Sequence, residues 1–495
     1  MSKLLFLFKF FRHVRLFTLV LLIPGLGAPP LLAPPFALEG PEVAPDEFRV
    51  TVFADGLNFP LGMAELPDGS ILATVTDGGA FFSSSGRVVR LVDADDDGVA
   101  DPPQILFGGL TGPQTAIRVG GELVFVTGAG KPLTILRLGE SPSAVLTMVG
   151  VINFNYPGDS NYHSHSALEL RETPGVSNSY DLFFQLGSEH NFDTPTRTVT
   201  ISSSSIAGVS GTLLGGSAYM MTIVDHGTSA SMESLVRIGT GLRNAAGFAF
   251  HPTRGDLYFQ DNGIDGLLNV NEPHSADEIN FIARSEIGQA PIPDFGFPDN
   301  YTAYRTAEVV GGEGVQPLIA FQPIPDPDTG LRAEGANSIE VAPPGFPAGL
   351  HGGVFVGFHG KFNMGGTSND ENPLVYANLE TGDYFHFIRG QQDGIGHLDG
   401  LLATRDSLFV ADLATAGNLN NGLGQGVIYQ IKSIAAPTPP DLAVRRVDSL
   451  FELDWDRGTL QRADEVTGPW ENVTEVFSPL VVEPSGPREF YRAEY

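Results

Sequence analysis

A short turn-and-strand unit that recurs along the chain constrains the fold more than any other feature. Four clear copies share a turn, four or five strand residues with a large apolar side chain, and then Asp or Gly: PDGSILATV (67–75), GGELVFVTG (120–128), RGDLYFQDNG (254–263) and RDSLFVADL (405–413). Sixty glycines and 37 prolines interrupt the chain, and almost no segment keeps a helical period. The sequence therefore predicts an all-β fold, either radially repeated as in propeller blades or a sandwich.

The N-terminal segment predicts an exported protein. Four basic residues precede an apolar run from Leu16 to about Leu26, and small residues and prolines follow. This pattern is typical of a signal peptide over residues 1–37, cleaved between Ala28 and Ala37. A membrane anchor is the alternative, but the apolar run is short and broken by Pro and Gly. We therefore expect a secreted, periplasmic or cell-surface location.

The C-terminal part differs in composition from the rest. The stretch AAPTPPDLA (435–443) predicts a semi-stiff linker over residues 434–443. The short strands that follow, and both tryptophans of the chain, predict a small β-sandwich-like module over residues 444–495. The repeated strands then occupy residues 45–433.

Composition excludes several partners. The chain has no cysteine, so disulfides cannot stabilise it after export. Its formal net charge is −30, from 58 acidic and 28 basic residues, which argues against nucleic acid or an anionic membrane and suits cation binding. Beyond the N-terminal run, no stretch is long and apolar enough to span a bilayer, so we expect no membrane partner for the mature chain.

Three motifs point together to one family. They are GLRNAAGFAFHPTRGDLYFQDNG (241–263), SADEINFI with FGFP (275–282 and 295–298), and GVFVGFHGKFN (353–363). In this order they resemble the soluble glucose/sorbosone dehydrogenase family over about residues 48–432. The resemblance implies a six-bladed β-propeller that uses pyrroloquinoline quinone with calcium to oxidise a small aldose sugar, with an external electron acceptor.

The resemblance implies a general base. In this family the base is a histidine in a short stretch that HSHSAL matches at His163, Ser166 and Leu168. His163 would remove the proton of the anomeric hydroxyl, a task that suits imidazole because its neutral form is available near neutral pH. His165 would be its neighbour on the other side of the strand. The alternative is that both are exposed loop histidines or a chance metal site.

The resemblance also implies cofactor contacts. Arg243 and Asn244 match the family's quinone-contacting pair, and a guanidinium suits a carboxylated cofactor. Lys361 matches a cofactor-contacting position, and Gln114 in GPQTAI matches a glutamine of the same pocket. A pair that only closes a turn, and a solvated lysine, are the alternatives for Arg243 with Asn244 and for Lys361.

Three calcium sites are predicted, two of them from the resemblance. By position, the resemblance implies main-chain carbonyls of Gly263 and Ile264 as ligands of the ion that holds the quinone. It also implies a nearby second ion shaped by Asp277 and Glu278, unless this acidic pair is only solvated.

A separate loop, DADDDGVAD (93–101), places Asp93, Asp95 and Asp97 at alternate positions before a glycine, as in the first half of a calcium loop. The terminal Glu of such a loop is missing, so a solvated turn is the alternative.

Two departures from the family weaken the prediction. Where the family has arginine in the last blade, this chain reads GIGHLDGLL, with His397 and Leu398. The acid that follows the strand after the base histidine is absent, and Ser188 and Glu189 stand there instead. We expect Glu189 to be the carboxylate that orients His163, and slow turnover if it does not.

Three functions therefore stay open. The first, which we favour, is a quinone-dependent sugar or alcohol dehydrogenase. The second is a non-catalytic propeller that binds a glycan or a protein outside the cell. The third is a calcium-dependent lactonase-type hydrolase, because propellers host all three activities.

Overall fold

The computed structural model describes residues 34–41, 43–158, 162–267, 269, 271–447, 450–474, 476–483 and 488–494. Residues 1–33 of the predicted signal peptide lie outside this description. Within it, helices are limited to three short 3-10 turns, η1 (Pro45–Glu47), η2 (Ala348–Leu350) and η3 (Gly366–Ser368). Accordingly, no described helix has the length and apolar character needed to cross a membrane.

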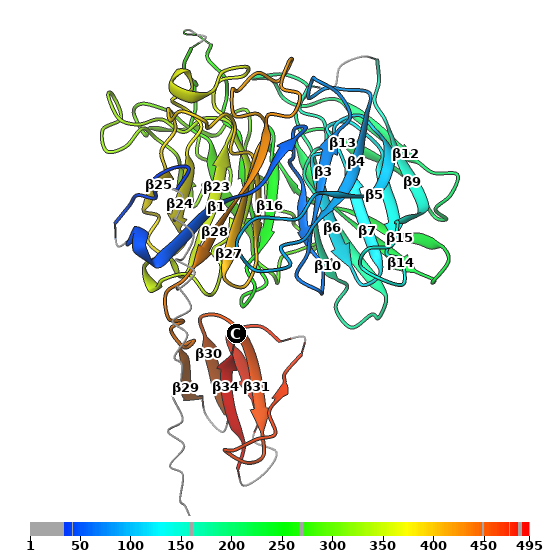
Figure 1. The fold of residues 1–495 in the computed structure, drawn as a ribbon, viewed down its shortest axis with the longest axis vertical. Coiled ribbons are helices and arrows are strands. Elements are labelled where there is room, and N and C mark those ends of the chain that lie inside the picture. Colours follow the sequence, from blue (N-terminus) through cyan, green and yellow to red (C-terminus); the bar gives the residue numbers. More distant parts are fainter. Residues whose placement is uncertain are drawn as a thin grey trace, which may run out of the picture. The chain divides into compact units, whose positions relative to one another are not determined.

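Six antiparallel sheets, here numbered as blades in chain order, make up most of the chain (Figure 1). Blade 1 contains β2 (Met63–Glu65), β3 (Ile71–Thr76), β4 (Ser85–Leu91) and β5 (Gln104–Thr111). Blade 2 contains β6 (Ala116–Gly120), β7 (Leu123–Thr127), β8 (Leu133–Arg137) and β9 (Thr147–Asn155), extended by β12 (Thr198–Ser202) and β13 (Ser210–Leu214). Blade 3 contains β10 (Glu169–Glu172), β11 (Ser179–Leu186), β14 (Ser217–Asp225) and β15 (Ala230–Thr240).

The remaining blades follow the same order from the first strand outward. Blade 4 contains β16 (Gly247–Phe250), β17 (Leu257–Asp261), β18 (Glu278–Ile282) and β21 (Ile319–Ala320). Blade 5 contains β22 (Ala336–Val341), β23 (Gly353–Phe358), β24 (Leu374–Asn378) and β25 (Tyr384–Ile388). Blade 6 contains β26 (Gly400–Ala403), β27 (Ser407–Asp412), β28 (Gly426–Ser433) and β1 (Phe48–Leu57). A separate hairpin pairs β19 (Tyr301–Thr302) with β20 (Val309–Val310).

The first strands of the blades form a closed ring. The contacts run in order from β2 through β6, β10, β16 and β22 to β26, and β26 contacts β2 in turn. This ring confirms the predicted six-bladed β-propeller.

Each pair of adjacent blades encloses its own hydrophobic core. Between blades 1 and 2, for example, Leu72 and Val88 pack with Val124, and five similar clusters fill the other interfaces. Strands β3, β7 and β11 are buried along their whole length because both faces of a blade are covered. Such strands read as continuous apolar runs rather than as alternating patterns.

The N-terminal strand completes the last blade. Strand β1 pairs antiparallel with β28, from Phe48 opposite Ser433 to Leu57 opposite Gly426. Ahead of it, Phe36 is 4% exposed and packs edge-on against Tyr429 at 4.9 Å. Phe36, inside the predicted signal peptide, therefore belongs to the core between blades 5 and 6. The cleavage site stays a prediction.

After β28 the chain forms two small three-stranded sheets. One contains β29 (Leu442–Val447), β30 (Leu450–Trp455) and β33 (Leu480–Val482), and the other β32 (Glu471–Asn472), β31 (Thr459–Ala463) and β34 (Phe490–Glu494). Leu453, Trp455 and Leu460 form their shared core. The division of the chain into propeller, linker and module stays a prediction.

Candidate functional site

Most of the predicted site residues lie at one end of the central channel, whereas the acidic loop at 93–101 follows β4 and lies at the other end. The inner strands enclose a channel of about 30 Å³, lined by residues such as Ser166, Ala246 and Asp399. Every inner strand is the first of its blade, so the segments that precede these strands lie at the same end. His163 precedes β10 and Arg243 precedes β16 in this way.

His163 is held with one ring nitrogen bonded and the other without a partner. Its Nδ1 lies 3.2 Å from Ser188 Oγ, and this hydroxyl donates to the His190 carbonyl at 2.6 Å. The hydroxyl proton is thus committed, so Nδ1 carries the hydrogen and Ser188 accepts it. No described residue hydrogen-bonds to Nε2, which keeps a lone pair available to accept a proton.

Burial and two guanidinium groups keep His163 neutral. Burial lowers its pKa to about 2, and the positive charges of Arg243 and Arg197 add to the effect. Arg197 also donates to the His163 carbonyl at 3.1 Å, and the backbone there has a φ of +43°. The ring stacks against Tyr162 with centroids 3.9 Å apart. Of these residues, Arg197 and Tyr162 were not singled out by the sequence.

His165 has the opposite hydrogen arrangement and a structural role. Its Nε2 lies 2.6 Å from the Lys131 carbonyl, which can only accept, so Nε2 carries the hydrogen. Its Nδ1 then accepts from Tyr156 Oη at 2.7 Å. The ring is 1% exposed and stacks on Phe154 at 3.7 Å. Both nitrogens are occupied, so His165 has no free lone pair.

Glu189 does not orient His163. Its Oε1 accepts from the backbone N–H of Thr196 at 2.6 Å and of Arg197 at 2.8 Å, and from the Thr196 hydroxyl. Its Oε2 is buried without a partner among the described residues. Glu189 thus holds the loop at 196–197, and Ser188, one residue earlier, makes the bond that we expected from this carboxylate. Sequence spacing pointed to the right turn but to the wrong residue.

Arg243 is buried beside His163 with part of its guanidinium free. Its side chain is 3% exposed, and Nη2 pairs with Asp265 at 2.7 Å and Asn191 at 2.8 Å. No described residue accepts a hydrogen bond from Nη1. The backbone N–H groups of Arg243 and Asn244 donate to the two carboxylate oxygens of Asp261, at 3.0 and 2.5 Å. Asp261, at the end of β17, is therefore a positioning residue that sequence reasoning missed.

Three predicted calcium residues, Gly263, Ile264 and Glu278, line a small cavity that Arg243 also lines. It measures about 20 Å³, which suits one water or one ion, and its polar lining includes Asp261 and Glu278. Burial, and then the charge of Asp261, raise the pKa of Glu278 to about 8. Asp277 instead accepts from the backbone N–H of Gly263 at 2.7 Å. The Ile264 carbonyl already accepts two backbone hydrogen bonds, at 2.7 and 3.3 Å.

Lys361 and the last-blade histidine are committed to other contacts. Lys361 Nζ pairs with Asp370 and lies 3.6 Å from Glu371. His397 is fully buried, and its nitrogens lie 2.7 and 3.0 Å from the carbonyls of His359 and Gly417. It stacks on the His359 ring at 4.1 Å. Neither Lys361 nor His397 offers a free positive charge at the mouth of the channel.

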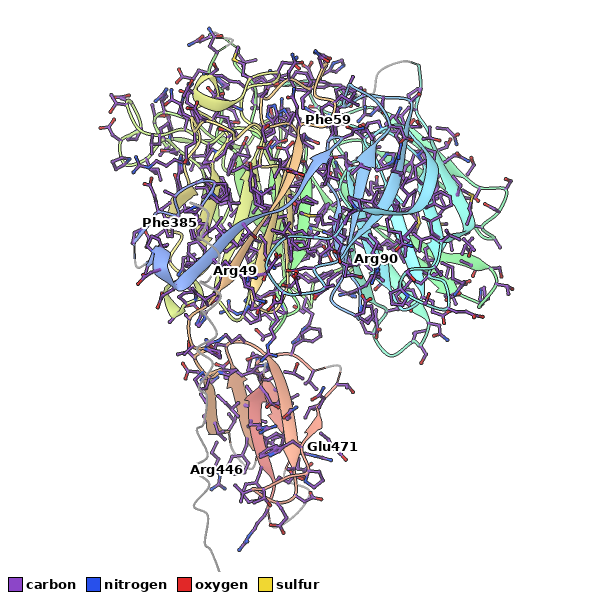
Figure 2. The ribbon with its side chains drawn as sticks, viewed as in Figure 1. Arg49, Phe59, Arg90, Phe385, Arg446 and Glu471 are labelled. Carbon is purple, nitrogen blue, oxygen red and sulfur yellow. The ribbon has the colours of Figure 1, made fainter. Side chains whose placement is uncertain are left out.

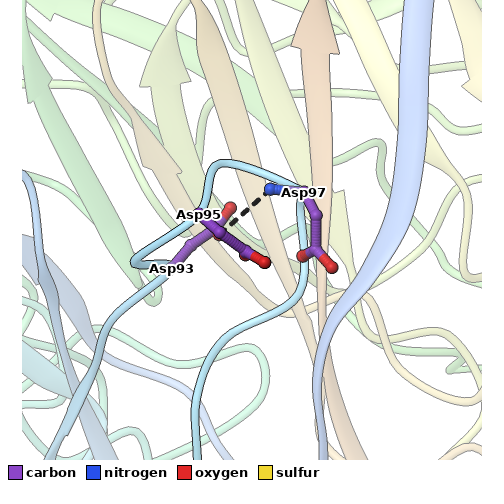
Figure 3. Close-up of side chains that lie close together, drawn as sticks. All are labelled: Asp93, Asp95 and Asp97. Atoms are coloured by element: carbon purple, nitrogen blue, oxygen red, sulfur yellow. Dashed lines mark hydrogen bonds between the residues drawn. The ribbon is translucent and has the colours of Figure 1, made fainter. Parts of the chain in front are cut away.

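The acidic loop of blade 1 brings its three predicted carboxylates together. Oxygens of Asp93, Asp95 and Asp97 lie within 4.8 Å of one another (Figure 3). Asp93 accepts from the backbone N–H of Asp97 at 3.1 Å and of Gly98 at 2.8 Å, and Gly98 has a φ of +87°. Calcium at this loop stays a prediction.

The residues present fit the implied cofactor on one side of the mouth. Gln114 Oε1 and Asn244 Oδ1 are buried oxygens without a partner in the described part of the chain, which suits a hard cation or a hydrogen-bond donor. Arg243 Nη1 supplies a donor for a carboxylate. The side of blades 5 and 6 fits less well, because Lys361 is paired with Asp370.

Comparisons with known proteins agree with the fold. The family model described as TrAA12-like matches residues 161–330. A Trichoderma reesei enzyme of carbohydrate-active family AA12 is 17% identical, with 81% of this chain and 99% of that chain covered and a TM-score of 0.50. The PQQ domain of a Coprinopsis cinerea pyranose dehydrogenase is 13% identical, with coverage of 81% and 98% and a TM-score of 0.51.

A curated relative matches only a segment. It is an uncharacterised protein of Borreliella burgdorferi, 30% identical over 138 residues. These cover 26% of this chain and 28% of that protein, so the chain spans under a third of that relative's length.

Proposed function

We propose that this chain is an exported, pyrroloquinoline quinone-dependent dehydrogenase. It oxidises an aldose sugar or a related alcohol at the anomeric carbon and passes the electrons to an external acceptor. The propeller fold and the TrAA12-like segment support this proposal. One observation carries the proposal. His163 presents a free Nε2 lone pair beside a buried guanidinium, whereas its neighbour His165 is saturated.

Each residue has a distinct part in this function. His163 Nε2 takes the proton of the sugar hydroxyl, and Ser188 keeps the ring in the required tautomer. Arg243, Asn244 and Gln114 would hold the quinone through the Arg243 guanidinium and the two unpaired carboxamide oxygens. The Gly263 carbonyl would be an oxygen donor for its calcium. When bound, the quinone supplies the acceptor for the hydride. Lys361 joins the site only if its pairing with Asp370 opens.

The electrostatics of the site favour an anionic ligand. A pKa of about 2 makes His163 a weak base, and part of the shift comes from Arg243 and Arg197. Negative charge bound against Arg243 would offset this repulsion and raise the pKa of His163. A carboxylated cofactor thus both occupies the site and strengthens its base.

A second candidate is a non-catalytic propeller that binds a glycan. The pairing of Lys361 with Asp370 and the burial of His397, which lowers its pKa to about 4, favour it, because both remove positive charge from the predicted quinone site.

Reconstitution separates the two candidates. We would add calcium and pyrroloquinoline quinone to the chain from residue 34 onward and measure quinone absorbance, melting temperature and dye reduction with an aldose. Quinone uptake should raise the melting temperature. R243K should weaken uptake at least about tenfold, because a lysine cannot replace the planar guanidinium. R254K is the matched control, since Arg254 is 43% exposed and pairs with Glu380 on the surface.

The outcomes are distinct. H163A should retain quinone uptake and lose about 10²- to 10⁴-fold in turnover. A lack of uptake by the unmodified chain at saturating quinone would reject the dehydrogenase and leave the glycan-binding candidate.

A further inference from the structure

Two exposed aromatic rings meet at the mouth of the propeller. Phe82 is 62% exposed and Phe362 is 53% exposed. Their rings are nearly parallel, at 29°, with centroids 6.4 Å apart. Phe82 lies in the loop between β3 and β4 of blade 1, and Phe362 lies between β23 and β24 of blade 5. The two rings therefore meet across blade 6.

Each ring of the pair packs against another ring below it. Phe82 packs edge-on against Phe81 at 5.0 Å, and Phe81 packs on Phe59, which is fully buried and labelled in Figure 2. Phe362 stacks on His359 at 5.6 Å, and Asp399 holds His359 Nδ1 at 2.6 Å. Rings held this firmly lose little conformational entropy when a ligand covers them.

One residue of blade 6 ties the two loops together. Leu419 accepts from the Phe81 N–H at 2.8 Å and donates its own N–H to Asn363 Oδ1 at 3.1 Å. The loop around it exposes Asn418, Asn420 and Asn421. Asn418 Oδ1 accepts two backbone hydrogen bonds and Asn420 Nδ2 donates to Asn363 Oδ1, whereas the Asn421 carboxamide bonds to no described residue. The exposed surface beside the rings therefore offers neutral hydrogen-bonding groups.

The aromatic rings and the asparagine side chains beside them suit the binding of a sugar. A pyranose with equatorial hydroxyls presents axial C–H groups on its ring faces and hydroxyls around its edge, so aromatic faces and carboxamides complement both parts. We propose that Phe82 and Phe362 form a platform on which one pyranose ring of the substrate stacks.

The position of the platform indicates a substrate longer than one sugar ring. Building on the proposed function, the reacting sugar lies at His163 and Arg243, on blades 3 and 4. The platform lies over blades 5, 6 and 1, across the mouth. Blades 3 and 4 lie across the ring of six from blades 6 and 1, so the platform is placed for a sugar ring other than the reacting one. The substrate class is therefore an oligosaccharide of equatorial pyranoses, with its oxidised end at His163 and a further ring on Phe82 and Phe362.

Sugar binding without the quinone tests the platform separately from the redox function. We would titrate the quinone-free chain with glucose and with cellotriose by calorimetry. F82S and F362S should each lower the preference for cellotriose over glucose about tenfold, the loss of one stacked aromatic contact. V145S is the matched control, since Val145 is 65% exposed in the loop between β8 and β9 of blade 2. It should leave the preference unchanged.

A fluorescence measurement on a tryptophan variant complements the two serine substitutions. The only tryptophans of the chain are Trp455 and Trp470 in the C-terminal part. F362W therefore adds a reporter to the propeller, and cellotriose should quench it while preserving or tightening binding.

An unchanged preference in both serine variants would overturn the proposal. So would a rise in the KM for the electron acceptor alone, which would assign the rings to that partner. Loss of quinone uptake with intact cellotriose binding would instead reject the proposed function and leave the platform standing.

Discussion

Removing the Ser188 hydroxyl tests how the candidate base is prepared. In S188A, His163 Nδ1–H loses its acceptor at 3.2 Å while the buried surroundings of the ring stay the same. The ring is then free to place its hydrogen on Nε2, the atom that must accept the proton. The substitution therefore weakens the base without removing it.

The magnitude follows from this one bond. A neutral hydrogen bond contributes about 1 kcal/mol, and a buried donor left unpaired costs about 1 to 3 kcal/mol. At 1.4 kcal/mol for each factor of ten, S188A should lower kcat/KM by about five- to 150-fold. This loss is smaller than that of H163A because the imidazole is still present.

Two measurements check the reasoning. Dye reduction with the reconstituted enzyme gives kcat/KM, and ¹⁵N chemical shifts give the tautomers without any cofactor. We expect the Nδ1–H form for His163 and the Nε2–H form for His165. S203A is the matched control, since Ser203 also donates to a backbone carbonyl at 2.6 Å, in the β12–β13 segment. An Nε2–H form for His163 in the unmodified protein would refute the assignment, as would full activity of S188A.

Two further predictions concern other parts of the propeller. Burial raises the pKa of Glu340 to about 8 from 4.5, so its contribution to stability is present below pH 4.5 and is lost as the pH rises to 8. At pH 9 the free energy of unfolding of E340Q should exceed that of the unmodified chain by on the order of 5 kcal/mol, and at pH 4 the two should be equal. The same urea midpoint for both proteins at pH 9 would contradict this. In the acidic loop, D95N should weaken calcium binding measured by calorimetry at least about tenfold and leave the urea midpoint without calcium unchanged, because Asp95 is exposed; equal heats for D95N and the unmodified chain would reject the site.

Much of the fold was predictable because each blade repeats one local pattern. Continuous apolar runs such as ILATVT mark strands covered on both faces, and β3 is buried throughout. The last blade was not predictable in this way. Its outer strand, β1, comes from the beginning of the propeller sequence. The sequence of β28 has no feature that identifies β1 as its pairing partner. The β12–β13 extension of blade 2 is equally non-local, since it follows blade 3 strand β11 in sequence.

The site was predictable in its residues but not in their roles. His163 and His165 are alike in the sequence, and they differ because Ser188 bonds one ring while Lys131 and Tyr156 bond the other. These partners come from other blades or loops and follow no fixed spacing. The pairing of Lys361 with Asp370 was missed for a similar reason. The role of Lys361 was taken from its family position, without considering the acidic residue in the loop that follows.

The pairing of β1 with β28 also decides how this protein is assembled. The sixth blade cannot be completed until the chain up to Ser433 is available and its strand finds β1 near the other end. The entropy of closing so long a loop grows only slowly with its length, so the ring closes at a modest thermodynamic cost. Until then, β28 presents an unpaired edge to other chains. The stage at which five blades have formed and the sixth is open is therefore when this chain is most prone to aggregate.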